Sequence, residues 1–310
     1  MKRLDFNKLA VVFCFCSTVS TNSTMAEKII AQGKCGAKLT WQLTSDSVLT
    51  ISGSGAMTDF TPNTSPWNTY RNQVKTITID DLATSIGNCA FLNCSKLTTA
   101  TIGNAVTTIG ITAFTNCSQL SSLNMGNSVA AIGIRAFESC TSLTALTLPN
   151  SVITIGPRAF ESCTGLLTVN IPHSVTTIGV RAFYLCRDLQ TVTIGNAVKT
   201  IGDRAFSGCY SLTALTIGNS VKTIGVAAFY YCTGLRTVTL PNSLITVEHN
   251  AFYNCSGLKH IHSGNGNPPV AFENSTFSGI DKSKCLLHVP AGSKEKYAVA
   301  NGWKEFSNIQ

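Results

Sequence analysis

The sequence predicts a β-rich solenoid, in which short coils of chain stack into a parallel β structure with a cap at each end. Three observations carry this prediction. Eight Ala-Phe dipeptides, from Phe91 to Phe252, follow one another at a constant step of 23 residues, a cysteine follows each of these phenylalanines by three positions, and a leucine follows each cysteine by three more. Repeats in fixed register are typical of solenoids, because one unit buries its apolar side chains only against its neighbours.

The repeated residues form columns that we expect to make up a ladder in the core. The phenylalanines are Phe91, Phe114, Phe137, Phe160, Phe183, Phe206, Phe229 and Phe252, and the cysteines are Cys94, Cys117, Cys140, Cys163, Cys186, Cys209, Cys232 and Cys255. An Ile-Gly pair precedes seven of the phenylalanines, and the eighth unit carries Val247-Glu248 instead.

Residues 175–197 illustrate the expected course of one coil. Residues 175–179 form a short extended piece that ends in a glycine turn, residues 181–186 form a short helical turn, and residues 189–194 form the main strand. Phe183 and Cys186 are three apart and share one face of the predicted helical turn. Neighbouring strands lie about 4.8 Å apart, so eight such coils predict a rod roughly 35 to 40 Å long.

Leucine spacing of this kind is the signature of a leucine-rich repeat. The form found here, I-G-x-R-A-F-x-x-C-x-x-L-T-x-V-x-I-P/G-N-S, closely resembles the BspA-like leucine-rich repeat family of bacterial and some protist surface proteins. The resemblance covers residues 82 to about 265, and residues 35–57, 66–67, 289–293, 297 and 302–303 are similar to the family's terminal modules. It implies a scaffold, and the better-known members are implicated in adhesion to host proteins and to other cells.

The chain divides into four predicted regions: a signal peptide at 1–26, an N-terminal β cap at 27–81, the leucine-rich repeat solenoid at 82–265 and a C-terminal cap at 266–310. Lys2, Arg3 and Lys8 precede an apolar stretch at 9–19, which is too short to cross a bilayer, and small residues follow before Ala26. The alternatives for this segment are a buried N-terminal strand and a lipidated Cys14 or Cys16, although the residues before Cys14 are not small. No later apolar run is long enough for a transmembrane span.

The two flanks are expected to cover the apolar ends of the stack. Residues 39–43 and 48–51 predict a hairpin, and residues 74–79 predict the first strand of the stack. Residues 286–289 predict a terminal strand, and Ser293 can cap a short helix through Ala300, with Trp303 and Phe306 closing the last coil. The Gly-, Asn- and Pro-rich residues 263–269 predict a flexible joint.

Composition excludes two classes of protein. Hydrophobic residues make up 44% and charged residues only 12%, which is too apolar for a disordered chain. The formal net charge of +8 is spread without a basic run, so no nucleic-acid partner is expected.

The cysteines predict packing rather than chemistry. Stacked thiols point in parallel, which disfavours disulfides, and the paired spacing of zinc sites is absent. We therefore expect small buried side chains, while disulfides or a metal along the column are the alternatives. Cys89 stands in a column that later carries arginine and is expected outside the core, and Cys35 and Cys285 are too far apart in the rod to pair.

Catalysis, cofactors and metals are not predicted. No nucleophile elbow, phosphate-binding glycine loop or pair of catalytic carboxylates occurs in the sequence. His260 and His262 are two apart on a predicted strand and so share a face, which makes them a possible metal pair. No third ligand lies near them in sequence, and no metal site is assigned.

Two exposed columns are the candidate binding residues. Thr147, Thr193, Thr216 and Thr239 belong to an outward, nearly uncharged column of the main strands, which is either a solvated sheet face or a contact face for protein or glycan. Arg135, Arg158, Arg181 and Arg204 hold one place in four successive units. This column is either solvated or a docking stripe for anionic glycans or an acidic protein, centred on Arg181 and Arg204, which lack the Glu that follows the first two arginines by three residues.

Together these features predict a secreted or cell-surface protein that is not an enzyme and that binds an extracellular protein or glycan, in adhesion or host interaction. The alternatives are a structural surface or matrix protein without a specific ligand and a polysaccharide-binding accessory protein. The ligand and the oligomeric state stay open at this point.

Overall fold

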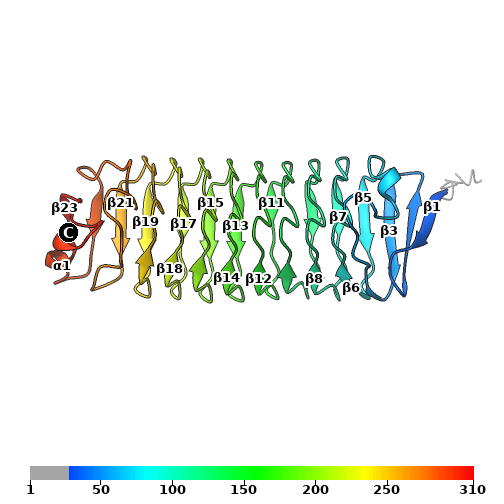
Figure 1. Ribbon diagram of the computed structural model, residues 1–310, viewed down its shortest axis with the longest axis horizontal. Coiled ribbons are helices and arrows are strands. Elements are labelled where there is room, and N and C mark those ends of the chain that lie inside the picture. Colours follow the sequence, from blue (N-terminus) through cyan, green and yellow to red (C-terminus); the bar gives the residue numbers. More distant parts are fainter. Residues whose placement is uncertain (1–27) are drawn as a thin grey trace, which may run out of the picture.

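The computed structural model describes residues 28–310, so the predicted signal peptide lies outside the described residues. The chain forms a straight rod of stacked coils, with the N-terminal hairpin at one end and the C-terminal helix at the other (Figure 1). Each regular coil contributes two strands, and the strands form two rows that run along the rod. The predicted parallel β solenoid is thereby confirmed.

The first row contains most of the longer strands, and its members pair in parallel with their neighbours except between β9 and β11. The row contains β3 (Val48–Gly53), β5 (Thr76–Ile79), β7 (Thr99–Thr101), β9 (Ser122–Asn124), β11 (Ala145–Leu146), β13 (Thr168–Ile171), β15 (Thr191–Ile194), β17 (Ala214–Thr216), β19 (Thr237–Leu240), β21 (His260–Ser263), β22 (Leu286–His288) and β23 (Asn308–Ile309). Because β9 and β11 are not paired, the row divides into an eight-stranded sheet from β11 to β23 and a six-stranded sheet, in which β1 (Ile29–Lys34) and β2 (Leu39–Thr44) precede β3 to β9. Parallel stacking therefore reaches beyond the eight repeats into both flanks.

The shorter strands form a second, nine-stranded parallel sheet. It contains β4 (Gly55–Ala56), β6 (Ala83–Ile86), β8 (Thr108–Ile109), β10 (Ala131–Ile132), β12 (Thr154–Ile155), β14 (Thr177–Ile178), β16 (Thr200–Ile201), β18 (Thr223–Ile224) and β20 (Thr246–Val247). Within the eight repeats, partner residues in neighbouring coils of both rows are 23 apart, as in the pairs Thr154–Thr177 and Thr168–Thr191. The sequence repeat is therefore the structural repeat.

The third side of each coil is a turn segment, and here the prediction of a short helical turn is wrong. Phe160 donates its N–H to the Ala182 carbonyl of the next coil at 2.8 Å, whereas Glu161 donates to the Arg158 carbonyl of its own coil at 3.0 Å. Two residues of the segment, Arg158 and Ser162, adopt left-handed φ angles of 57° and 60°. The alternation reserves every second N–H for the neighbouring coil, which a helical turn could not do.

The phenylalanine column is the centre of the core, as predicted. All eight rings are fully buried, and successive centroids lie between 5.0 and 5.5 Å apart. Trp67 stacks on Phe91 at the N-terminal end, and Phe277 stacks on Phe252 at the C-terminal end. The column therefore continues through both flanks, where side chains outside the repeat close it.

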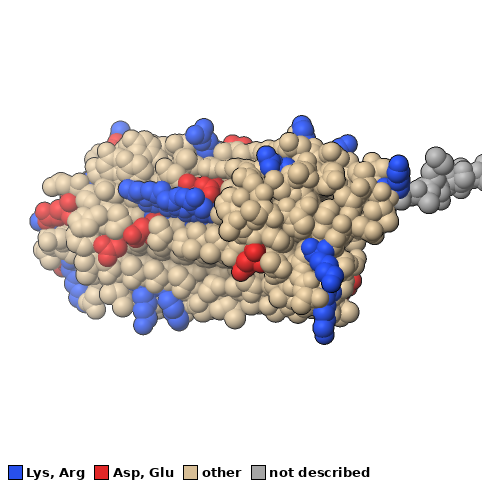
Figure 2. All heavy atoms as spheres, turned by 45° about the vertical axis from the view of Figure 1, so that its right-hand side comes forward, with Lys and Arg blue, Asp and Glu red and all other residues tan. Residues whose placement is uncertain are grey.

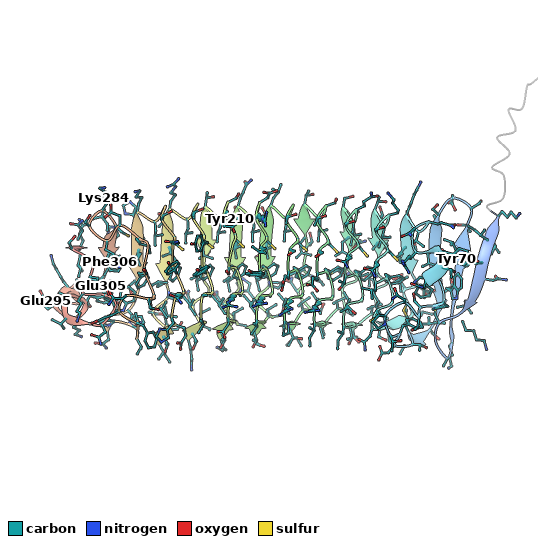
Figure 3. The ribbon with its side chains drawn as sticks, turned by 45° about the horizontal axis from the view of Figure 1, so that its top comes forward. Tyr70, Tyr210, Lys284, Glu295, Glu305 and Phe306 are labelled. Carbon is teal, nitrogen blue, oxygen red and sulfur yellow. The ribbon has the colours of Figure 1, made fainter. Side chains whose placement is uncertain are left out.

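The N-terminal flank contains the predicted hairpin. β1 (Ile29–Lys34) pairs antiparallel with β2 (Leu39–Thr44), and β2 pairs antiparallel with β3. A 3₁₀ helix, η1 (Asn68–Tyr70), follows Trp67 and leads into β5. Figure 3 shows Tyr70, the last residue of η1, at this end of the rod.

The C-terminal flank contains the predicted strand β22 and one helix, α1 (Lys294–Val299). Ser293 precedes the helix, but its hydroxyl makes no capping hydrogen bond. Trp303 and Phe306 are buried against Phe277, as expected for residues that close the last coil. Figure 3 shows Phe306 at this end of the rod.

Residues 263–269 are held in place, which contradicts the prediction of a flexible joint. The Tyr297 hydroxyl lies 2.6 Å from the Ser263 hydroxyl and donates to the Asn265 carbonyl at 3.0 Å. The Trp303 indole N–H donates to the Pro269 carbonyl at 2.7 Å. These side chains lie 32 to 34 residues further along the chain, and they hold the residues that follow Ser263, which is itself the last residue of β21 and pairs with Leu240.

Candidate functional site

The cysteine column is buried, and each thiol has a hydrogen-bonding role as well. From Cys117 to Cys255, every thiol of the column donates to the carbonyl of the phenylalanine 26 residues earlier, at 3.1 to 3.4 Å. That carbonyl also accepts the N–H of the cysteine in its own coil, as Phe114 does from Cys117. The column is therefore a ladder of small side chains with weak donors, and it needs no disulfide or metal.

Burial also suppresses the reactivity of these thiols. It raises the pKa of Cys94 and that of Cys163 from 9.0 to about 12. For Cys117, Cys140, Cys186 and Cys232, burial and the neighbouring thiols hold the pKa well above its ordinary value. Because the thiolate is the nucleophile, we expect these six cysteines to react slowly in the folded protein.

Native protein should therefore react with a thiol reagent at few of its cysteines, whereas denatured protein should show most of the 11 described cysteines as free thiols. Stability should also fall in alkali. The raised pKa keeps protons on the folded chain, while the unfolded chain releases them above its ordinary thiol pKa of 9.0. Thiol titration with and without denaturant checks the predicted reactivity. Urea unfolding at a pH below 9.0 and at a pH above 9.0 checks the predicted loss of stability. Mass-spectrometric detection of disulfides between adjacent column cysteines would contradict it.

The three cysteines outside the column are also free and buried. Cys89 lies outside the hydrophobic core cluster, in keeping with its expected position, but its thiol is covered and lies 3.0 Å from the Thr112 hydroxyl. Cys35 belongs to the N-terminal flank, and Cys285 directly precedes β22. Burial raises the pKa of both thiols to about 11.

The arginine column runs along the turn segments, and all four of its residues have left-handed φ angles between 54° and 57°. The two predicted local pairs are present: Arg135 Nε lies 3.5 Å from Glu138 Oε2, and Arg158 Nε lies 3.6 Å from Glu161 Oε2. Burial, followed by the charge of Glu138, raises the pKa of the Glu161 carboxyl, against the opposing effect of Arg158. The first half of the column is thus partly neutralised.

Arg181 and Arg204 form no ion pair with any residue of 28–310. The Arg181 guanidinium lies over the Tyr184 ring, 5.4 Å from its centroid, and Arg204 is exposed. Between the two arginines and Asp203 the surface is hollowed by about 380 Å³. Figure 2 shows a row of basic side chains along the long axis of the rod, with acidic side chains beside part of it.

A cluster of tyrosines, which the sequence analysis missed, lies beside the two unpaired arginines. We call Tyr184, Tyr210, Tyr230, Tyr231 and Tyr253 the tyrosine patch. The Tyr230 ring lies 4.6 Å from that of Tyr231 and 4.9 Å from that of Tyr253, while Tyr210 is 41% exposed. Figure 3 shows Tyr210 between the middle and the C-terminal end of the rod.

Small residues open a hollow within the tyrosine patch. Ser207 and Gly208 occupy the two places that Tyr230 and Tyr231 fill in the next coil, and a hollow of about 170 Å³ lies there. A second hollow of about 380 Å³ lies between Tyr184, Arg204 and Tyr230. The signal for this site was present in the sequence, because five of the seven tyrosines fall between 184 and 253.

The threonine column lies on the outer face of the longer strands, as predicted. Thr147 follows β11, and Thr193, Thr216 and Thr239 lie on β15, β17 and β19; all four are exposed. The residues on either side of each threonine are buried, so the column forms a flat polar face. This face lies on a different side of the coil from the arginines.

A histidine cluster lies where the last regular coil meets the C-terminal flank. His260 and His262 point outward from β21, and His288 pairs in register with His262 on β22. The His262 and His288 rings stack at 4.3 Å, and the His260 and His288 rings lie 5.5 Å apart. The sequence predicts His288 in a terminal strand but does not join it to His260 and His262, because it follows His262 by 26 residues, outside the 23-residue period.

Comparison with known proteins agrees with this geometry. The family model of the BspA-type leucine-rich repeat region matches residues 68–188 and 166–284, in six copies. The chain belongs to the BspA-type leucine-rich repeat family. The expected membership is thereby confirmed, and the BspA-type match extends beyond the eight repeats into both flanks.

Among solved structures, two leucine-rich repeat proteins share this BspA-type chain's architecture. A protein of Bacteroides ovatus ATCC 8483 has 23% identity and a TM-score of 0.57, over 88% of this chain and 87% of that one. A protein of T. pallidum has 27% identity and a TM-score of 0.51, over 66% of this chain and 91% of that one. No curated protein matches the chain. None of the helices within residues 28–310 is long and apolar enough to cross a membrane.

Proposed function

We propose that this BspA-type protein is secreted or exposed at a cell surface and binds another protein, in adhesion or in contact with a host protein, without catalysing a reaction. Family membership supports a binding role, since repeat solenoids present long rigid surfaces. The observation that carries the proposal is the tyrosine patch beside Arg181 and Arg204.

Tyrosine and arginine are, with tryptophan, the residue types that are enriched among the residues responsible for most binding energy at protein interfaces. The tyrosine patch presents both kinds around two hollows, into which side chains of a partner could insert. Backbone hydrogen bonds between coils hold its turn segments, as between Tyr231 N–H and the Tyr253 carbonyl at 2.8 Å. A site built in this way is ordered before it binds, which lowers the entropic cost of association.

The threonine column supports the proposal less. It is flat and uncharged, and threonine at these positions is explained by its preference for strands. The four threonines stay candidate contact residues, in addition to the four arginines. The predicted boundaries at 26, 81 and 265 are retained as part of the proposal.

A binding screen separates the proposal from its two alternatives. The purified chain is offered a panel of extracellular matrix proteins and a glycan array, and the source cell is surface-biotinylated to fix the compartment. We expect a protein ligand whose binding is lost in a Tyr230→Ser, Tyr231→Ser variant and kept in a Lys28→Ser, Lys34→Ser variant, which is altered only in the N-terminal flank. Binding to glycans alone would favour the polysaccharide-binding accessory protein, and no ligand at all would favour the structural surface protein.

The unpaired arginines give the site a charge preference that can be measured. A variant carrying Arg181→Ser and Arg204→Ser should elute from heparin at lower salt than the unmodified chain, because it has lost two positive charges that attract the anionic heparin. Salt screens this attraction, since exposed charges act over only about 8 Å at physiological ionic strength. The matched control carries Lys28→Ser and Lys34→Ser. Lys28 directly precedes β1 and Lys34 is its last residue, so this variant loses the same charge at the N-terminal end of the rod, far from the arginine column. If the arginine variant and the unmodified chain elute together, the stripe is not a docking site for anions.

A further inference from the structure

The histidine cluster is built from two neighbouring strands, β21 and β22, and its residues depart from the repeat. On the preceding strand β19, Thr237 and Thr239 occupy the places that His260 and His262 take on β21. Threonine therefore satisfies the sheet at these places. Among the residues 28–310, this is the only group of three or more histidine, cysteine or acidic side chains with ligand atoms close enough to share an ion.

We propose that His260, His262 and His288 bind one divalent transition metal ion. One ring nitrogen from each residue lies within 4.8 Å of the others. His260 Nδ1 lies 3.2 Å from His288 Nε2. Two nitrogens at 2.0 to 2.1 Å from a tetrahedral zinc ion are separated by roughly 3.3 Å, so this pair already has the spacing of two ligands.

Binding of one ion requires the rings to turn. The three rings are nearly parallel, with interplanar angles between 8° and 19°, so they must rotate for their in-plane lone pairs to converge on the same ion. Rotation about the bond to the histidine ring has a broad preference and is inexpensive. The three side chains are half-buried on an outward sheet face, where an ion can reach them from solvent.

The donor set selects the class of ion. Imidazole nitrogens suit zinc, copper and nickel, whereas calcium and magnesium require oxygen ligands. Three histidines leave a fourth position for water or a ligand atom from elsewhere. The alternative to a metal is a hydrogen bond between His260 and His288. Such a bond explains why these two rings lie close together, but it does not explain a histidine at position 262.

An ion at this place would join two parts of the fold. β21 closes the regular repeat, and β22 begins after the segment of residues 264–285, so the metal would tie the C-terminal flank to the last coil. Binding to the folded chain alone would raise its stability according to the ion concentration relative to its Kd. The proposed site is independent of the tyrosine patch and does not rest on the proposed function.

The test uses the full chain without a polyhistidine tag. Isothermal titration with Zn²⁺ alone should show one site per chain and should raise the Tm. His288→Gln should weaken zinc binding by at least about 10-fold, since even residues that only orient a ligand contribute 10- to 100-fold to metal affinity. His173→Gln is the matched control and should bind zinc as the unmodified chain does, because His173 is exposed at a turn in another part of the rod.

Circular dichroism without metal shows whether the His288→Gln chain is folded, and Co²⁺ spectra identify the donors. Nitrogen ligation gives visible bands without the strong near-ultraviolet band of a sulfur ligand. The proposal is overturned if zinc does not bind, if His288→Gln binds it as tightly as His173→Gln, or if a sulfur-to-cobalt band shows that the ion sits on cysteines.

Discussion

Replacing Phe183 by alanine should lower the free energy of unfolding by about 3 to 5 kcal/mol. The ring is completely buried in the middle of the column and stacks on Phe160 and Phe206, at 5.2 Å in each case. Backbone hydrogen bonds fix the spacing between this coil and its neighbours, as in the bond from Phe183 N–H to the Ala205 carbonyl at 2.7 Å. These coils therefore cannot close the space that the ring leaves. The variant loses the free energy gained by burying the ring, and it also retains a cavity, which adds to the destabilisation.

Urea unfolding followed by far-ultraviolet circular dichroism gives the free-energy difference. Leu167→Ala in the preceding unit is the matched control: its side chain is apolar but 42% exposed, and the change should cost less than about 1 kcal/mol. A loss below 1 kcal/mol for the Phe183 variant as well would mean that the column does not carry the core.

The second large effect is expected at Gly179, which turns the chain after β14. A Cβ atom there would lie 2.6 Å from the carbonyl carbon of Gly156 and 2.6 Å from the nitrogen of Pro157. Both are backbone atoms of the preceding coil, and they cannot move aside without breaking the ladder between β12 and β14. Gly179→Ala should therefore cost about 2 to 3 kcal/mol, near the upper end of the usual range for overpacking.

Gly266→Ala is the matched control for this change. The nearest atom to its added Cβ would be the Ser293 hydroxyl oxygen at 3.7 Å, which is an ordinary contact. Its free energy of unfolding should stay within about 1 kcal/mol of the unmodified value. If both alanine variants are equally stable, close approach between coils is not the reason for glycine at position 179.

The core could be predicted from sequence because the repeat keeps its register. A column such as Phe183 and Phe206, spaced at 23 residues, has only one place in a stacked coil. The turn segment could not be predicted in the same way. The spacing of Phe183 and Cys186 fits a helical turn and equally fits the observed turns, and what decides between them is hydrogen bonding to the next coil, which is non-local.

The sites show the same limit. The arginine pairs with Glu138 and Glu161 are local and were predicted, whereas the tyrosine patch combines side chains from several places in neighbouring coils. His288 reaches His262 through a step of 26 residues that breaks the period. Residues 263–269 have the composition of a loose segment, but Tyr297 and Trp303 hold them through contacts that composition does not encode.

The positions of the tryptophans along the rod determine which part of the molecule intrinsic fluorescence can report on. All three tryptophans lie at the ends of the rod: Trp41 and Trp67 contact each other at the N-terminal end, and Trp303 packs on Phe277 at the C-terminal end. The coils between them contain only phenylalanine and tyrosine as aromatic residues. Intrinsic tryptophan fluorescence is therefore a reporter of the two ends, and its red shift marks fraying there, while the melting of the central coils has to be followed through the backbone.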